Sequence, residues 1–218
     1  MSNYIAIISG GTGLIGNEVI QQLISDSKFE KIIVLNRRSI AYSNSKIQEI
    51  IVDFNHLENS LKDLHPTHAF CCLGTTIKKA GSKEAFRKVD FDYVLNFAKA
   101  VHQLGCQNFS VITALGTNKS SFIFYNQVKF EITEALKNVG FNQLNILQPS
   151  LLLGERSESR SGEDTAQKFF KWTKNLWVGP LKNYAGIQGS QVAKAMIAIS
   201  KSSNEGVHTY ESAKLQDY

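Results

Sequence analysis

A glycine-rich junction near the start of the chain constrains the fold more than any other feature. Residues 9–16 read SGGTGLIG and follow an apolar, β-branched run at residues 4–8. Beyond the glycines, apolar residues recur at helical spacing over residues 14–24. Glycines let a chain turn tightly and let backbones approach each other closely. The chain is therefore predicted to open with a strand, a glycine turn and a helix.

Strand-like and helix-like patterns alternate along the rest of the chain. Short apolar runs typical of buried strands occupy residues 31–35, 47–52, 68–73, 108–112, 142–147 and 207–210. Longer helical patterns occupy residues 83–104, 122–139, 166–176 and 190–200. This alternation predicts an α/β fold with a doubly wound, mainly parallel sheet. The 218 residues suit one core, so we expect a single domain, in which residues from about 150 to 218 form a small cap on the substrate side.

Composition excludes several classes of protein. Hydrophobic residues make up 43% of the chain and charged residues 20%, which is typical of globular proteins. No apolar run approaches the roughly 20 residues of a membrane helix, and the first residues do not read as a signal peptide. The chain has 3 cysteines, two of them adjacent, and no spaced Cys/His set for a metal. We therefore expect reduced thiols, no metal site, no membrane partner and a cytoplasmic location.

The net charge of +5 suits a polyanionic ligand. Basic residues cluster between residues 78 and 88, which raises nucleic-acid binding as an alternative. No helix-turn-helix pattern and no aromatic RNA-binding motif accompanies this cluster. No nucleic-acid partner is therefore expected.

The glycine junction fits two dinucleotide-binding fingerprints at once. Gly11, Gly13 and Gly16 satisfy GxGxxG, whereas Gly10, Gly13 and Gly16 satisfy GxxGxxG. In either case, backbone N–H groups and the positive end of the helix can hold a pyrophosphate. An ordinary glycine-rich turn is the alternative, but the position between a strand and a helix favours the phosphate site. The residues expected to bind this part of a dinucleotide are Gly10, Thr12, Gly13, Leu14, Ile15 and Gly16.

The end of the second strand indicates which dinucleotide is bound. NAD sites usually place Asp or Glu there, but this chain has Asn36, Arg37 and Arg38. Guanidinium groups pair with a 2′-phosphate, so the predicted cofactor is NADP(H), with solvated surface arginines as the alternative. Further cofactor contacts are expected where later strands end, near the adenine and where the strand order reverses. These residues are Asp53, Phe54, Leu73, Gly74 and Thr75.

A YxxxK motif lies on the helix expected after the fifth strand. Tyr125 and Lys129 are four residues apart and therefore share a helix face. The ammonium favours a phenolate, so Tyr125 can exchange a proton with a carbonyl oxygen while a hydride moves at the nicotinamide. Lys129 can also bind the nicotinamide ribose. The alternative is a half-buried tyrosine beside a lysine that reaches to solvent.

Together these motifs resemble the short-chain dehydrogenase/reductase superfamily. In particular, the chain is similar to its atypical branch around the human Tat-interacting protein, a family of NAD(P)H-binding proteins described as oxidoreductases and metastasis suppressors. The resemblance covers nearly the whole chain and implies a Rossmann fold with bound NADPH, while it leaves the substrate undefined. Besides the motifs above, the residues that carry it are 70–76, 79–81, 89–90, 92–95, 119–121, 156, 158–160 and 162–163.

One position departs from the superfamily pattern. The resemblance implies a hydroxyl at the end of the fifth strand that anchors the substrate carbonyl, and the related proteins have two serines there. This chain has Thr113 and Ala114. Thr113 retains the hydroxyl if the first position is the working one, and Ala114 has lost it if the second is. The expected catalytic residues are Thr113, Tyr125 and Lys129.

Further contacts follow from the resemblance and from the polar stretch at residues 155–164. The turn after the sixth strand is expected near the nicotinamide, which makes Pro149 and Leu151 cofactor contacts; a simple strand end is the alternative. Thr76, Arg156 and Arg160 are expected substrate contacts, with solvation of the arginines as the alternative.

Two functions remain open at this point. The first is an NADPH-dependent reductase of a small carbonyl substrate. The second is a non-catalytic NADP(H)-binding regulator that binds a protein partner in a cofactor-dependent way, which the loss of a hydroxyl at Ala114 favours. The superfamily often dimerises, so a homodimer is compatible with either.

Overall fold

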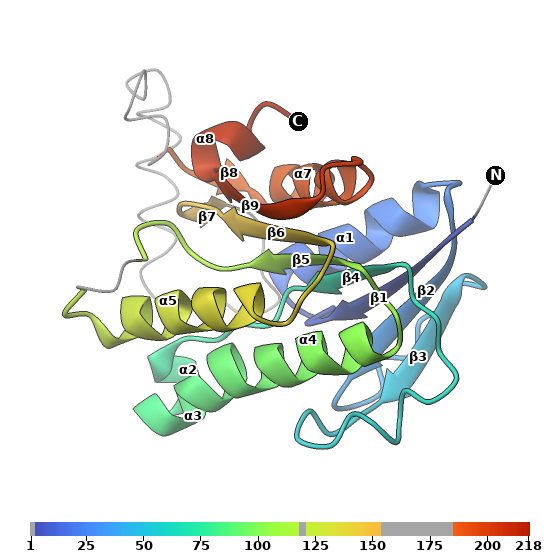
Figure 1. Ribbon diagram of the computed structural model, residues 1–218, viewed down its shortest axis with the longest axis horizontal. Coiled ribbons are helices and arrows are strands. Elements are labelled where there is room, and N and C mark those ends of the chain that lie inside the picture. The colour runs from blue at the N-terminus through green and yellow to red at the C-terminus, as the bar shows by residue number, and fades with distance from the viewer. Residues whose placement is uncertain (1–2, 118–120, 154–184) are drawn as a thin grey trace.

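The computed structural model describes residues 3–117, 121–153 and 185–218, and a seven-stranded sheet forms its centre (Figure 1). The strand order is β3-β2-β1-β4-β5-β6-β9, and every neighbouring pair is parallel. The strands are β1 (Tyr4–Ser9), β2 (Phe29–Asn36), β3 (Ile47–Ile51), β4 (His68–Cys71), β5 (Asn108–Ile112), β6 (Gln143–Gln148) and β9 (Gly206–Glu211). The predicted doubly wound α/β fold is therefore confirmed, and it is a Rossmann fold.

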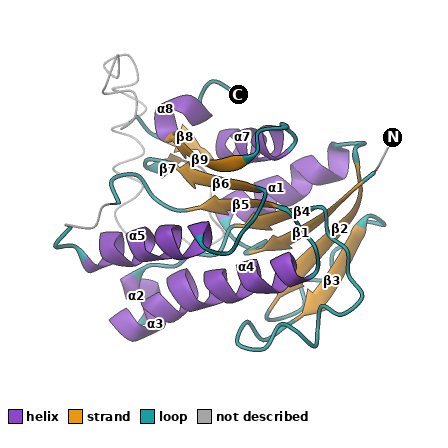
Figure 2. Ribbon diagram, in the orientation of Figure 1, coloured by secondary structure: helices purple, strands orange, loops and turns teal. Residues whose placement is uncertain are grey.

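Helices cover both faces of the sheet (Figure 2). One face carries α1 (Leu14–Ser25) and α7 (Gly189–Ser200), and the other carries α4 (Tyr93–Gln103) and α5 (Phe124–Lys137). The shorter elements are α2 (Ile77–Ala80), α3 (Lys83–Arg87), the π-helical η1 (Lys88–Asp92), α8 (Ser212–Leu215), β7 (Leu152–Leu153) and β8 (Ile187–Gln188). The last two strands pair with each other in a separate small sheet.

Two hydrophobic cores result from this layering. On the side of α4 and α5, Phe97 and Phe109 are fully buried, with ring centroids 5.8 Å apart. On the side of α1 and α7, Ile20 and Met196 are fully buried. All four residues of β4 are buried, because a parallel strand covered on both faces has no solvent side. Burial of each such large side chain contributes about 1.5–3 kcal/mol.

The strand order reverses at the carboxyl end of β1, and the region between the loops that follow β1 and β4 is called the crevice below. From β1 the chain moves outward to β2 and β3, and then returns across the sheet to β4 on the other side of β1. At such a reversal of strand order, the loops after the two central strands diverge and leave room for a ligand. The glycine junction follows β1 and residues 72–76 follow β4, so both lie at this point.

The structure differs from the predicted helices in several places. The pattern at residues 83–104 predicts one helix, whereas the chain forms α3, one π-helical segment and then α4. Apolar periodicity is read over windows of about 11–18 residues, so it does not resolve a single π-helical turn inside a longer helical pattern. The helix predicted at residues 122–139 is α5 and begins two residues later, at Phe124. The predicted helix at residues 166–176 and the polar loop at 155–164 lie outside the described residues.

The last described residues belong to the central layers. β9 pairs with β6 along its whole length, and α7 covers the sheet beside α1. Part of the segment expected as a cap, residues 185–218, therefore completes the sheet and one of its two faces. Residues 154–184 lie outside the described part of the chain.

A buried histidine in this core makes stability depend on pH. The His68 ring lies 4.3 Å from the Tyr4 ring and 5.4 Å from that of Phe29, and burial lowers the pKa of His68 to about 4. The neutral ring is thus favoured in the folded state, whereas the unfolded chain titrates near ~6.5. The contribution of His68 to the free energy of unfolding should be constant above pH ~6.5 and fall by about 3 kcal/mol as the pH drops to ~4.

Urea denaturation at pH 7 and pH 4.5 checks this expectation. The His68→Phe variant should lose less stability between the two pH values than wild type. The variant His65→Gln, at an exposed histidine, should lose as much as wild type. An equal loss in wild type and His68→Phe would contradict the assignment.

Candidate functional site

The glycine junction is shaped by close backbone approach. Gly10 has φ +81°, and a Cβ built on it would lie 2.5 Å from the carbonyl carbon and oxygen of Cys72. A Cβ on Gly16 would lie 2.1 Å from the carbonyl oxygen of Gly10. Any side chain at these two positions would push β1, the turn after β4 and the first turn of α1 apart. The backbone thus requires the outer glycines of the GxxGxxG fingerprint.

The middle glycine is exposed instead of packed. Gly13 is the N-cap of α1 and has no side chain with which to cap the helix, and its N–H donates to the Gly10 carbonyl at 3.0 Å. A Cβ on Gly13 would meet only the Gly10 oxygen, at 3.4 Å. A Cβ on Gly11 would instead point inward, 2.7 Å from Cδ1 of Ile20. The uncapped end of α1 with its exposed glycine fits a dinucleotide pyrophosphate, which the N–H groups and the helix dipole attract.

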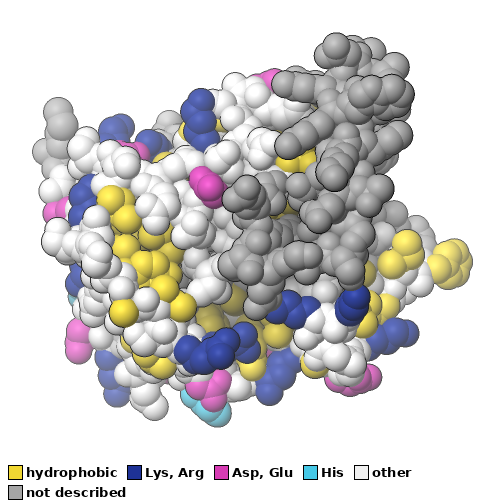
Figure 3. Space-filling view, turned by 180° about the vertical axis from the view of Figure 1, so that it is seen from behind, with side chains coloured by type: hydrophobic (Ala, Val, Ile, Leu, Met, Phe, Trp, Pro, Cys, Tyr) yellow, Lys and Arg dark blue, Asp and Glu magenta, His cyan; other side chains and the backbone are white. Residues whose placement is uncertain are grey.

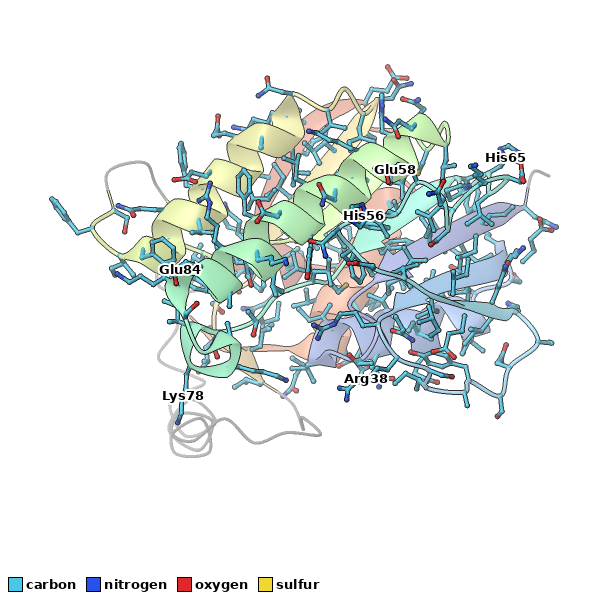
Figure 4. The ribbon with its side chains drawn as sticks, turned by 90° about the horizontal axis from the view of Figure 1, so that it is seen from below. Arg38, His56, Glu58, His65, Lys78 and Glu84 are labelled. Atoms are coloured by element: carbon cyan, nitrogen blue, oxygen red, sulfur yellow. The ribbon has the colours of Figure 1, made fainter. Side chains whose placement is uncertain are left out.

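Two arginines project from the end of β2. Asn36 is buried, whereas Arg37 and Arg38 are exposed, and Figure 4 shows Arg38 pointing away from the ribbon beside the first strands. Neither arginine forms an ion pair or a hydrogen bond with another residue that the structure describes. Asn36 donates from Nδ2 to Oε1 of Glu49, at 2.7 Å. Both guanidinium groups are therefore open to an anionic ligand at this edge.

The residues after β3 are engaged locally. The carboxylate of Asp53 accepts a hydrogen bond from the Asn55 N–H at 2.9 Å, and this turn lowers the pKa of Asp53. The Phe54 ring is buried, with its centroid 5.5 Å from that of Tyr93. The Phe54 side chain is thus part of the core, and its carbonyl oxygen accepts a hydrogen bond from Nδ2 of Asn96 at 3.0 Å.

The turn after β4 covers a buried ion pair. Nζ of Lys129 lies 2.8 Å from Oδ1 of Asp90, and their side chains are 5% and 0% exposed. The N–H of Thr75 donates to the other carboxylate oxygen at 2.8 Å. A Cβ on Gly74 would lie 3.6 Å from Oδ1 of Asp90 and 3.9 Å from Nζ of Lys129. Because Gly74 has no side chain, this residue leaves the space between the ion pair and the crevice open.

The charge of Lys129 is fixed by its neighbours. Burial acts to lower the pKa of Lys129, but the negative charges of Asp90 and of a Tyr125 phenolate outweigh burial and raise the pKa. Oδ1 of Asp90 accepts no well-directed hydrogen bond from the residues described. A charged ammonium thus lies beneath the crevice, paired with the carboxylate of Asp90.

Tyr125 lies one helical turn before Lys129 on α5 and is half-buried. Its ring centroid is 5.4 Å from that of Phe86, which holds the phenol against α3. Thr113, by contrast, is buried, and its hydroxyl donates to the carbonyl oxygen of Leu147 at 3.4 Å. The neighbouring Ala114 is the partly exposed member of the pair. The structure thus brings Tyr125 and Lys129 together, but it directs the Thr113 hydroxyl into the sheet.

The remaining predicted contacts lie around the same edge. Pro149 accepts a hydrogen bond from the Leu115 N–H at 3.3 Å, and Leu151 accepts one from the Ile187 N–H at 3.0 Å. The hydroxyl of Thr76 caps α2 by accepting from the Lys79 N–H at 3.1 Å. Arg156 and Arg160 lie outside the described residues.

Two acidic residues of this region, Asp90 and Glu49, were not predicted as site residues from the sequence. Asp90 follows Phe86 by four residues and precedes Val94 by four, and both neighbours are buried. An acid at a buried position of a helical pattern was the available signal, since such a group needs a partner. Glu49 carried no comparable signal, because a half-buried acid on a short strand is not unusual and nothing in the sequence relates it to residues 36–41.

Other classes of site are absent from the described part of the chain. Within residues 3–117, 121–153 and 185–218, no group of three His, Cys, Asp or Glu side chains is arranged for a metal, and no helix is long and apolar enough to cross a membrane. All 3 cysteines are free, and burial raises the pKa of Cys71 to about 11. Basic side chains gather along the lower part of the face shown in Figure 3, beside hydrophobic ones.

Comparison with known proteins agrees with this geometry. Residues 6–118 match the family model described as the NAD dependent epimerase/dehydratase family. Protein HTATIP2 of Rattus norvegicus is 33% identical over 181 residues, which covers 81% of this chain and 74% of that protein. The protein named FMP52, mitochondrial, of Candida albicans is 32% identical over 206 residues, covering 91% of this chain and 89% of that protein.

Solved structures share the fold at low sequence identity. A UDP-N-acetylglucosamine 4-epimerase from Methanobrevibacter ruminantium, in complex with UDP-N-acetylmuramic acid, superposes with a TM-score of 0.72 at 18% identity. The match covers 97% of this chain and 77% of the epimerase. The enzyme WbmG of Bordetella bronchiseptica, in complex with NAD and UDP, gives a TM-score of 0.71 at 14% identity, over 96% of this chain and 73% of that one.

The comparisons correct one expectation and establish the family. The expected cytoplasmic location is wrong, because the fungal relatives are named as mitochondrial proteins. Reduced cysteines report a reducing environment and not which compartment provides it, so they could not support that choice. With the matched family model, the HTATIP2 and FMP52 relatives and the glycine crevice, this chain belongs to the NAD dependent epimerase/dehydratase family, as an NAD(P)-binding Rossmann protein like HTATIP2 and FMP52.

Proposed function

We propose that this protein is an NADP(H)-dependent reductase of small carbonyl compounds. The observation that carries the proposal is the placement of Tyr125 one helical turn from the buried, charged Lys129. Both lie at the crevice where the strand order reverses, which is where dinucleotides bind in such sheets.

The cofactor choice is supported by the end of β2. The residues that follow the strand are two exposed arginines, Arg37 and Arg38, and not a carboxylate. A 2′-phosphate pairs with guanidinium groups, whereas the ribose hydroxyls of NAD usually require an acid at this position. The uncapped N-terminus of α1 would hold the pyrophosphate, and Lys129 would hold the nicotinamide ribose.

The chemistry assigned to the chain is proton transfer. When bound, the reduced cofactor supplies the hydride that adds to the carbonyl carbon. Tyr125 donates its phenolic proton to the carbonyl oxygen, so that an alcohol forms and a phenolate remains. The ammonium of Lys129 stabilises this phenolate, and Asp90 keeps the ammonium charged. Solvent then returns the proton to Tyr125.

The Tyr125→Phe variant tests this function. With NADPH and a panel of aldehydes, ketones and quinones, we expect turnover to fall by about 10²–10⁴-fold in the variant, because the general acid is removed. NADPH affinity, measured by titration calorimetry, should remain close to that of wild type, because the ring and Lys129 are retained. Wild-type turnover no higher than that of the variant would refute the reductase.

A second candidate function is supported by Thr113 and Ala114. The Thr113 hydroxyl is bonded to the Leu147 carbonyl, and Ala114 has no hydroxyl to anchor a substrate carbonyl. We therefore also propose, as the alternative, a regulator whose affinity for a protein partner changes with NADP(H). This alternative expects tight NADPH binding without turnover above Tyr125→Phe, together with partner binding that requires the cofactor.

The names of the fungal relatives also support a mitochondrial location for this protein. Fluorescence microscopy of the tagged full chain beside a mitochondrial marker tests this proposal.

A further inference from the structure

Both carboxylate oxygens of Glu49 accept hydrogen bonds from residues 36–41, the loop that carries Arg37 and Arg38. Glu49 lies on β3 opposite Val34 of β2. Its Oε1 accepts from Nδ2 of Asn36 at 2.7 Å and from the Ile40 N–H at 2.8 Å. Its Oε2 accepts from the Ser39 hydroxyl at 3.0 Å and from the Ala41 N–H at 3.2 Å. A carboxylate offers about four acceptor positions, so none remains for a ribose hydroxyl.

The loop conformation depends on an anion at this place. Ala41 has φ +56°, a left-handed conformation that non-glycine residues seldom adopt. The successive N–H groups of Ile40 and Ala41 converge on one carboxylate, which is the geometry of an anion-binding nest. Burial acts to raise the pKa of Glu49, but the hydrogen bonds from Asn36 and Ile40 outweigh it and lower the pKa. The chain thus provides its own anion to hold the loop.

The far end of the loop packs beside the glycine junction. The hydroxyl of Tyr42 would lie 3.3 Å from a Cβ on Gly11, and Tyr42 packs against the core beneath α1. Arg37 and Arg38 therefore belong to a segment anchored at Asn36, at the nest and at Tyr42.

We propose that Glu49 is the positioning residue for recognition of the cofactor 2′-phosphate. By closing the nest, Glu49 fixes residues 36–42 so that Arg37 and Arg38 extend from one defined loop at the end of β2. Fixed guanidinium groups bind an anion with less loss of conformational freedom than mobile ones, which raises affinity. This inference rests on the proposed NADP(H) site. It adds the residue that positions the two arginines and so sets the preference for a cofactor with a 2′-phosphate.

The test compares two probes that differ only in the 2′-phosphate, namely 2′,5′-ADP and 5′-AMP. Titration calorimetry on the apo protein gives an affinity ratio for the two probes. In wild type we expect a ratio of about 10–100 in favour of 2′,5′-ADP, from charge-assisted hydrogen bonds to the phosphate. In Glu49→Gln the ratio should fall about tenfold, with 5′-AMP affinity within about twofold of wild type. The Arg37→Ala, Arg38→Ala double variant should lose the preference altogether.

A matched control separates this role from a general change of charge. Glu58→Gln removes the same charge from an exposed carboxylate, and Figure 4 shows Glu58 well apart from Arg38. This variant should keep the wild-type ratio. If Glu49→Gln does not fold, as judged by circular dichroism, Ser39→Ala removes one of the four donors and should lower the ratio about threefold.

The outcomes distinguish the two proposals. A wild-type preference that persists in Glu49→Gln or Ser39→Ala would overturn the role of Glu49 alone. Equal losses of 2′,5′-ADP and 5′-AMP affinity would also overturn it, because they indicate a merely structural residue. A wild-type protein that binds the two probes equally would overturn the NADP(H) site, and the role of Glu49 with it.

Discussion

Replacement of Asp90 by alanine is expected to lower the free energy of unfolding by about 3–5 kcal/mol, because it leaves the buried ammonium of Lys129 without its partner. The change also removes the acceptor for the Thr75 N–H. Urea denaturation at pH 7 measures the difference. The double variant Asp90→Ala, Lys129→Met should be more stable than Asp90→Ala, because the uncompensated charge is gone.

The Asp26–Lys201 pair provides the control for this prediction. Nζ of Lys201 and Oδ2 of Asp26 are 2.6 Å apart, but the side chain of Lys201 is 26% exposed and that of Asp26 is 18% exposed. Loss of a pair that water can solvate costs only about 1 kcal/mol, so Asp26→Ala should be much milder than Asp90→Ala. Equal effects of the two substitutions would show that the ion pair under Gly74 is not the element that holds this region together.

Replacement of Gly16 by alanine should damage both the fold and the cofactor site. The new Cβ would lie 2.1 Å from the Gly10 carbonyl oxygen, which belongs to the backbone and cannot move independently. We expect a loss of about 1–3 kcal/mol in the free energy of unfolding, despite the better helix propensity of alanine. Displacement of the turn should lower NADPH affinity by at least about tenfold. Urea denaturation and titration calorimetry measure the two effects.

Gly13→Ala should separate these effects. Gly13 has φ −80° and ψ 166°, which any residue adopts, and its Cβ would make only an ordinary contact at 3.4 Å. The free energy of unfolding should stay within about 0.5 kcal/mol of wild type. NADPH affinity should still fall, because the Cβ projects where a pyrophosphate approaches the helix end. A Gly16→Ala protein as stable as Gly13→Ala would contradict the packing argument.

Much of the fold could be predicted because the central strands of the sheet are buried on both faces. Residues 108–112 form β5 as predicted, and the other predicted strands of the sheet match their observed counterparts to within a few residues. A buried parallel strand is a short, nearly continuous apolar run, which is a strong local signal. The glycine junction was equally readable, because only glycine tolerates the contacts at Gly10 and Gly16.

The candidate site was predicted less completely. Tyr125 and Lys129 share a helix face, as their spacing requires. Their spacing gave no indication of Asp90, which lies on the π-helical segment 39 residues before Lys129 and is the direct partner of the lysine. Nor did the pair Thr113–Ala114 indicate which side chain faces the crevice, because that depends on how the chain leaves β5.

The sequence by itself determined the layered α/β architecture, the glycine crevice and the two arginines beside it. These features depend on local chemistry: apolar periodicity, the conformational freedom of glycine, and the charge of a side chain. Only the tertiary structure decided that Asp90 holds Lys129, that Glu49 closes the arginine loop, and that the Thr113 hydroxyl is directed inward. Each of these joins residues that lie far apart in the chain or on different elements, and a hydrogen bond or ion pair forms only where folding brings both partners within about 3.5 Å.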